Sequence, residues 1–153
     1  MALQVQSTNL FGEVELLFQR LAQELPAHTA NLRVYDVPGG GGGIELTPTN
    51  PASATISVFA DNSAVYTFSF GLRSYWEFPF ERRYRYDEKS IIAEIEEMSR
   101  AVLAGHCEET RGLVSISGRI HVRDYTYKTT TLPIFRLPRF GTRRYAPYAP
   151  QQP

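Results

Sequence analysis

Cysteine and long apolar runs are scarce in this sequence of 153 residues. Its single cysteine, Cys107, has no second cysteine with which to form an internal disulfide, so we expect a reducing, cytoplasmic environment. No run of 18 or more apolar residues occurs, which excludes a membrane-spanning helix and gives no reason to expect a membrane partner. The residues after Met1 carry neither a cationic start nor an apolar core, so we predict no secretory signal.

Net charge is also absent, because 16 acidic residues balance 16 basic ones. The balance is uneven along the chain: residues 1–72 hold six acidic and two basic residues, a net charge of −4, and residues 73–86 carry +2. Residues 87–110 carry −5, and the remainder carries +7. All cations except Lys89 and Lys128 are arginine, which favours planar, bidentate contacts. The total of zero therefore does not exclude an anionic partner.

Two segments have the apolar periodicity of amphipathic helices. The first begins near Asn9, a good helix cap, and ends at Pro26. The second begins at Asp87 and ends at Gly105, where a left-handed cap is expected. Each helix should pack one face on a core, because apolar residues recur at helical spacing. These residues are Leu10, Val14, Leu17, Phe18, Leu21 and Leu25 in the first helix, and Ile91, Ile95, Met98 and Val102 in the second.

Most other segments alternate between apolar and polar residues and predict strands. They cover residues 32–36, 44–46, 52–60, 64–72, 75–80, 113–122 and 125–131. Pro79 places its strand at an edge or a bend, and Gly118 indicates a bulge or turn. This order predicts an α+β fold with a mainly antiparallel sheet of about six to seven strands packed by the two amphipathic helices. We expect residues 1–132 to form one domain, and residues 133–153, rich in proline and arginine, to form an extended tail outside the core.

No combination of residues typical of a catalytic or metal site is evident. His106 and Cys107 are neighbours, so in an extended segment their side chains point to opposite faces and cannot form a nucleophile–base pair. Zinc ligands usually come from spaced pairs, which are missing here. We therefore predict no catalytic, metal-binding or cofactor-binding residue, no cofactor and no enzymatic activity. His28, His106 and His121 are interpreted as surface or partly buried residues, and Cys107 as a small buried one.

Carboxylates gather in and just after the second predicted helix. Glu94 and Glu97 share one side of that helix, and Glu108 and Glu109 follow in the next segment. A solvated helix face explains such charges equally well. The functional interpretation is a docking surface for a basic protein, because charge complementarity speeds association and rejects wrong partners. The candidate protein-binding residues are thus Glu94, Glu97, Glu108 and Glu109.

Arginine and aromatic residues are interleaved in residues 73–86 and again in the tail. Bases stack on aromatic rings while guanidinium groups hold phosphates, so the pattern is one that single-stranded nucleic acid needs. For residues 73–86 the favoured interpretation is aromatic strand residues of a core, whereas the tail is left open between nucleic-acid binding and docking on a neighbouring subunit. Burial of Tyr75, Trp76, Phe78 and Phe80 would separate a core from an interface. The candidate residues for nucleic-acid binding or docking are Arg82, Arg83, Arg85, Arg139, Arg143, Arg144 and Tyr145.

The stretch from the aromatic strands through the second helix resembles small α+β bacterial proteins of the toxin-immunity type. The resemblance rests on Trp76-Glu77-Phe78-Pro79, the Ile- and Glu-rich helix within residues 84–110, its Ala101-Val-Leu-Ala-Gly105 end and Glu108-Glu109, about a third of the chain. It implies a non-catalytic cytosolic protein that neutralises a toxin domain by binding it. We therefore predict a protein-binding module whose partner is a basic toxin domain or copies of itself. The alternatives are a nucleic-acid-binding module acting through the aromatic stretch and basic tail, and a structural subunit with the tail as docking arm.

Overall fold

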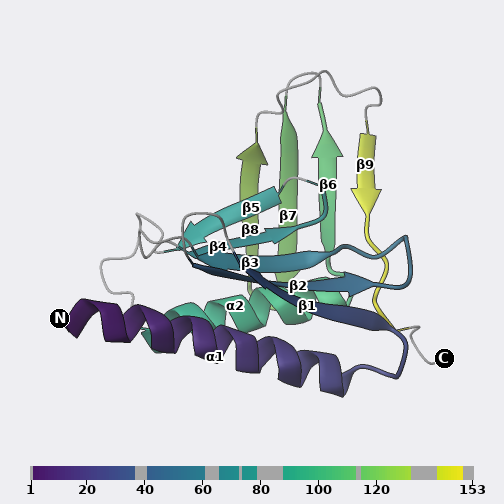
Figure 1. Ribbon diagram of the computed structural model, residues 1–153. Coiled ribbons are helices and arrows are strands. Elements are labelled where there is room, and N and C mark those ends of the chain that lie inside the picture. The colour runs from purple at the N-terminus through teal and green to yellow at the C-terminus, as the bar shows by residue number, and fades with distance from the viewer. Residues whose placement is uncertain are drawn as a thin grey trace.

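Two helices and nine strands, arranged in two antiparallel sheets, make up the described part of the chain (Figure 1). A computed structural model describes residues 2–36, 41–60, 66–72, 74–78, 88–112, 115–131 and 141–149. The α+β class and the mainly antiparallel pairing predicted from the sequence are confirmed. The predicted number of strands is too low, and the strands form two sheets rather than one.

The first sheet is a five-stranded meander in the order β1-β2-β3-β4-β5. Its strands are β1 (Ala30–Asp36), β2 (Gly42–Pro48), β3 (Ile56–Ala60), β4 (Tyr66–Phe70) and β5 (Ser74–Phe78). The strands predicted at residues 52–60 and 64–72 are present as β3 and β4, which pair antiparallel, although both are shorter than the alternation indicated. Tyr66, Phe68 and Phe70 share one face of β4 and are all buried, as their spacing predicts.

The aromatic strand β5 contributes to the core. Trp76 and Phe78 are 4% and 0% exposed, whereas Tyr75, between the buried Ser74 and Trp76, is 43% exposed. β5 lies at an edge of the first sheet, as Pro79 indicated. The indole Nε1 of Trp76 donates to the carbonyl oxygen of Lys128 at 3.2 Å, which joins this edge to the second sheet. The aromatic residues described on β5 are therefore mostly core; Phe80 lies outside the described residues.

Both helices lie on the same side of the first sheet and contact each other (Figure 1). α1 spans Ala2–Glu24 and α2 spans Glu88–Leu103. α1 begins before the predicted start at Asn9, because the preceding segment contains the strong helix formers Ala2, Leu3 and Gln4. α1 contacts β1 and β2, while α2 contacts the second sheet. Most residues of the two predicted stripes are buried: Val14, Leu17, Phe18, Leu21, Ile91, Ile95, Met98 and Val102. Leu25 is partly buried, and the side chain of Leu10 lies outside the described ones.

α2 ends in the glycine cap that the sequence predicts. Gly105 has a φ of 80°, and its N–H donates to the carbonyl oxygen of Val102 at 3.0 Å. The N–H of His106 donates to the carbonyl oxygen of Ala101 at 2.8 Å. These two bonds form a Schellman motif, for which glycine is favoured because it adopts positive φ without steric cost. The motif turns the chain directly from α2 into β6.

The second sheet has the strand order β8-β7-β6-β9. Its strands are β6 (Cys107–Arg111), β7 (Ile116–Val122), β8 (Tyr125–Thr131) and β9 (Gly141–Arg144). They run across the direction of the first sheet (Figure 1), and β5 contacts both β7 and β8. The prediction missed β6 and β9, because Cys-Glu-Glu-Thr-Arg and Gly-Thr-Arg-Arg lack apolar alternation.

Gly118 lies in a regular part of β7, opposite Glu109 and Thr129, so the predicted bulge or turn is wrong. The position is occupied by glycine because the first sheet approaches it closely. A Cβ atom on Gly118 would lie 2.1 Å from Oγ of Ser74 on β5. The missing side chain thus allows the two sheets to meet at this point.

The prediction that the chain after residue 132 lies outside the core is wrong for residues 141–149. β9 pairs with β6, and the following residues Tyr145 and Tyr148 are 5% and 3% exposed. The Tyr148 hydroxyl lies 3.1 Å from the carbonyl oxygen of Leu46 and 2.6 Å from that of Ala54. Aromatic anchors therefore attach this segment to the first sheet. Residues 132–140 and 150–153 lie outside the described residues.

Candidate functional site

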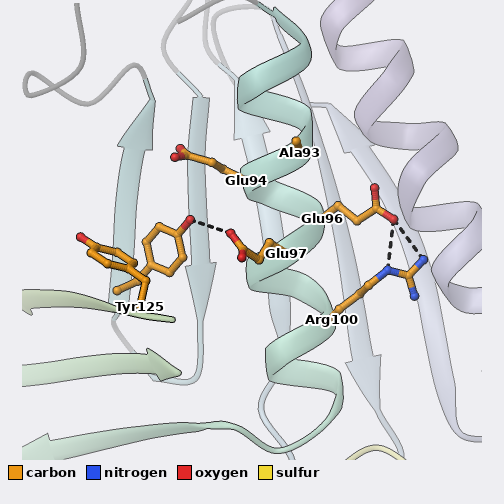
Figure 2. Close-up of a pocket in the computed structure, with 7 residues that line it drawn as sticks. Ala93, Glu94, Glu96, Glu97, Arg100 and Tyr125 are labelled. Carbon is orange, nitrogen blue, oxygen red and sulfur yellow. Dashed lines mark hydrogen bonds and ion pairs between the residues drawn. The ribbon is translucent and has the colours of Figure 1, made fainter. Parts of the chain in front are cut away.

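An open groove with acidic walls lies where α2 meets β8, an edge strand of the second sheet (Figure 2). Figure 2 shows Glu94 and Glu97 projecting from α2 on the side where Tyr125 lies, while Glu96 and Arg100 project from the other side of the helix. The groove, with a volume of about 690 Å³, is lined by Ala93, Glu94, Glu96, Glu97, Arg100, Tyr125 and Tyr127. We call it the acidic groove.

Strand β8 orients the carboxylate of Glu97. The hydroxyl of Tyr127 donates to Oε2 of Glu97 at 3.1 Å, and Tyr127 is itself only 7% exposed. Glu97 remains exposed to solvent. Because a carboxylate accepts about four hydrogen bonds, the bond from Tyr127 leaves capacity for a ligand. Glu97 is thus both fixed in direction and accessible.

Tyr125 presents an aromatic ring beside these carboxylates. It is 58% exposed, and its ring centroid lies 4.9 Å from that of Tyr127 with an interplanar angle of 86°. This edge-to-face geometry is a favoured arrangement of aromatic pairs. The buried Tyr127 therefore supports the exposed ring, and the acidic groove combines negative charge with a fixed aromatic surface.

Arg100 neutralises the side of α2 that faces α1. Its guanidinium lies 3.0 Å from Glu96 on the preceding turn and 2.8 Å from Glu24 on α1. The hydrogen bond from Arg100 lowers the pKa of the Glu24 carboxyl. Arg20 adds a further ion pair to Glu96 at 3.4 Å. These pairs compensate Glu96, and Glu94 is only 8% exposed, so Glu97 supplies the accessible negative charge of the groove.

Glu109 was a candidate binding residue, but the structure places it between the two sheets. It is 0% exposed and accepts hydrogen bonds from the backbone N–H of Leu72 at 2.9 Å, from Oγ of Ser74 at 2.7 Å and from the hydroxyl of Tyr145. Burial and this last bond raise the pKa of Tyr145. The donors come from two distant parts of the chain, the β4–β5 connection and the segment after β9, so Glu109 holds the fold together and is inaccessible to a partner.

Glu108 also lies away from the acidic groove, on the opposite face of β6 from Glu109. Its carboxylate, with 15% of the side chain exposed, lies 3.7 Å from Arg119, 3.4 Å from His121 and 3.6 Å from Arg144. Of the four predicted protein-binding residues, the structure therefore brings only Glu94 and Glu97 together in the groove.

The predicted basic residues do not form one described cluster. Arg143 donates to the carbonyl oxygen of Pro51 at 2.8 Å and lies over the ring of Tyr145 at 4.9 Å. Tyr145 is buried, whereas Arg143 and Arg144 are both exposed, Arg144 with 87% of its side chain accessible. The remaining candidates, Arg82, Arg83, Arg85 and Arg139, lie outside the described residues.

Sequence reasoning missed Tyr125 and Tyr127. Their spacing of two residues on a predicted strand indicates that they share a face. What that face meets depends on α2, because the partner Glu97 is 30 positions away in the sequence. A local pattern cannot identify such a partner.

Cys107 is buried, as predicted, with 3% exposure. Burial, and then the charges of Glu109 and Glu108, raise the pKa of its thiol to about 12. Because the thiolate is the reactive form, we expect the native protein to resist a thiol-reactive disulfide reagent at about pH 8. The denatured chain should release one equivalent of chromophore at once. Fast release from the native protein would contradict this burial.

The described residues offer little sign of metal or membrane chemistry. His28, His106 and His121 are exposed, and within the described ranges no group of three or more His, Cys, Asp or Glu side chains could hold a metal ion. Neither described helix has the length and apolar character needed to cross a membrane.

No protein-family model, curated protein or solved structure matches this chain. We take the acidic groove as the candidate functional site.

Proposed function

We propose that this protein is a non-catalytic, cytoplasmic binding module that engages a basic protein surface through the acidic groove. The observation that carries the proposal is that the exposed carboxylate of Glu97 and the exposed ring of Tyr125 line one groove, together with the largely buried Glu94. The carboxylates come from α2 and the ring from β8, so the site exists only in the folded chain.

A cationic side chain is the ligand that complements this arrangement. An arginine guanidinium can pair with a carboxylate in a bidentate manner and stack on an aromatic face. At an exposed site the contact of a cation with an aromatic ring contributes about 0.5–1 kcal/mol. Because Tyr127 orients Glu97 and packs against Tyr125, both groups are positioned before the ligand arrives. Such preorganisation lowers the entropic cost of binding.

A basic toxin domain is the partner we propose for this groove. The segment that resembles toxin-immunity proteins includes α2, the helix that carries Glu94 and Glu97. Neutralising a toxin by surface binding requires no catalytic group in the inhibitor. Steering between an acidic groove and a basic domain would speed their association.

We expect the groove to bind a short fluorescein-labelled polyarginine peptide. Glu97→Gln removes the accessible charge, and Tyr125→Ala removes the ring while leaving every charge in place. Each change should weaken binding by about two- to fivefold, because a rim charge or a cation–π contact contributes about 0.5–1 kcal/mol. Fluorescence anisotropy at low and moderate salt measures the dissociation constant of the peptide for the unmodified protein and for each variant.

The matched control is Glu77→Gln, which removes an exposed carboxylate on β5 without touching the groove lining. Its affinity for the peptide should remain close to that of the unmodified protein. Equal losses for Glu77→Gln and Glu97→Gln, with no effect of Tyr125→Ala, would mean that the peptide senses only overall charge. That result would overturn the proposed site.

A further inference from the structure

The outward face of the second sheet is polar and cationic. Strand register places Arg119, Lys128 and Arg144 on this face, on three different strands. Glu108 is the one carboxylate among its described residues, and the other outward positions are His121 or serine and threonine. The alternate residues on the same strands point into the core; Ile120 and Tyr127, for example, are buried. We call this surface the cationic face.

Glu108 organises the cationic face. Its largely buried carboxylate lies 3.7 Å from the guanidinium of Arg119 and 3.6 Å from that of Arg144. These side chains remain 47% and 87% exposed, so a ligand can still reach their outer edges. Lys128, paired with Arg119 across the ladder, is also exposed. One carboxylate thus compensates only part of the positive charge.

The cationic face and the acidic groove lie on opposite sides of the second sheet. α2 contacts β7, and the bond from Tyr127 to Glu97 shows that the inward side chains of β8 face α2. Lys128 follows Tyr127 along the strand, so its side chain points the other way. The sheet separates the two charged surfaces, which therefore cannot meet within one molecule.

We propose that the cationic face docks on the acidic groove of a second copy of this chain. The inference rests on the proposed function, because it names one occupant of the groove. Charge complementarity supports it: the cations Lys128 and Arg144 are exposed on the face of one copy, and the exposed carboxylate of Glu97 lines the groove of the other. The net charge of zero adds no overall repulsion between copies.

Such a contact joins two different surfaces and is heterologous. Each copy in a pair keeps one unused groove and one unused cationic face, so further copies can add head to tail. The contact depends on exposed charges, and screening at physiological ionic strength, where the Debye length is about 8 Å, should weaken it. Self-association should therefore rise with protein concentration and fall with salt.

The experiment uses two full-length variants and sedimentation velocity at low salt. Glu97→Lys disables the groove but leaves the cationic face intact. Lys128→Gln combined with Arg144→Gln disables the face but leaves the groove intact. We expect each variant to associate at least about tenfold more weakly than the unmodified protein. An equimolar mixture should form a 1:1 dimer that grows no further, because only one groove and one face remain functional.

Several results would overturn the inference. The unmodified protein could stay monomeric at all concentrations at low salt, the two variants could assemble as the unmodified protein does, or their mixture could stay monomeric. Binding of the same preparation to the polyarginine peptide separates the two proposals. If the protein is monomeric but binds the peptide through Glu97, self-association is contradicted and the proposed function stands. If it is monomeric and binds no peptide, both proposals are contradicted. Binding of a DNA duplex by that monomer, lost on Lys128→Gln with Arg144→Gln, would assign the face to a polyanion instead.

Discussion

Replacing Glu109 by alanine is expected to lower the free energy of unfolding by about 4 kcal/mol. The change removes the common acceptor of Leu72, Ser74 and Tyr145, and leaves the buried donors of Ser74 and Tyr145 without it. Each buried unsatisfied donor costs about 1–3 kcal/mol. Urea denaturation followed by fluorescence measures the loss, and the melting temperature should fall by roughly 10 °C. Glu109→Gln should give a smaller loss, because its amide retains one acceptor oxygen.

The neighbouring Glu108 provides a matched control for this prediction. Glu108→Ala removes a carboxylate from the same strand, but on the opposite face and among exposed cations. The free energy of unfolding of Glu108→Ala should fall by about 1 kcal/mol or less, because such ion pairs contribute little to stability. Similar losses for the two alanine variants would contradict the central position assigned to Glu109.

Adding a single methyl group at Gly118 should destabilise the fold by about 3 kcal/mol. The new Cβ of Gly118→Ala would lie 2.1 Å from Oγ and 2.4 Å from Cβ of Ser74, so β5 and β7 would have to separate. Chemical denaturation measures the effect. In a Ser74→Gly background the same change should cost at least about 1 kcal/mol less, because the clashing atoms are gone.

Gly12→Ala tests whether the effect is specific to the contact between the sheets. Gly12 lies inside α1, and nothing stands within 4 Å of a Cβ placed there. Alanine is the better helix former, so this variant should gain about 1 kcal/mol. A loss at Gly12 equal to that at Gly118, or additive effects of Gly118→Ala and Ser74→Gly, would contradict the close approach of the two sheets.

These structural residues also support the proposed binding site. The acidic groove requires α2 and β8 to lie side by side, with Tyr127 bonded to Glu97. β8 belongs to the sheet that Glu109 attaches to the turn after β4 and to β5. Loss of Glu109 should therefore reduce the population of molecules with an intact groove as well as their stability.

Local patterns predicted the elements whose information lies in adjacent residues. The apolar stripe of Ile91, Ile95, Met98 and Val102 predicted one face of α2, and all four are buried. Gly105 predicted the end of that helix, and its φ of 80° confirms it. The alternation along β4 placed Tyr66, Phe68 and Phe70 on one face, and all three are buried, although Thr67 on the other face is buried as well. Each of these features depends only on periodicity or on a backbone preference.

Other features could not be predicted because their causes are far apart in the sequence. Glu108 and Glu109 are chemically identical neighbours, yet one lies among exposed arginines and the other is fully buried. Nothing local distinguishes them, because the donors to Glu109 lie 35 to 37 positions away. The charged strands β6 and β9 were also missed. They lack an apolar pattern, and each is paired with a strand that is distant in the sequence.

The sequence alone determined an α+β chain with two amphipathic helices, mainly antiparallel strands and charge separated into blocks, because composition and periodicity are local properties. Only the tertiary structure decided which of those charges meet. It buried Glu109 between two sheets and placed Glu97 against Tyr127. It also put the cations of β7, β8 and β9 on the face of the second sheet opposite the acidic groove. Those outcomes depend on which strands pair and on the face to which each side chain points, and long-range packing sets both.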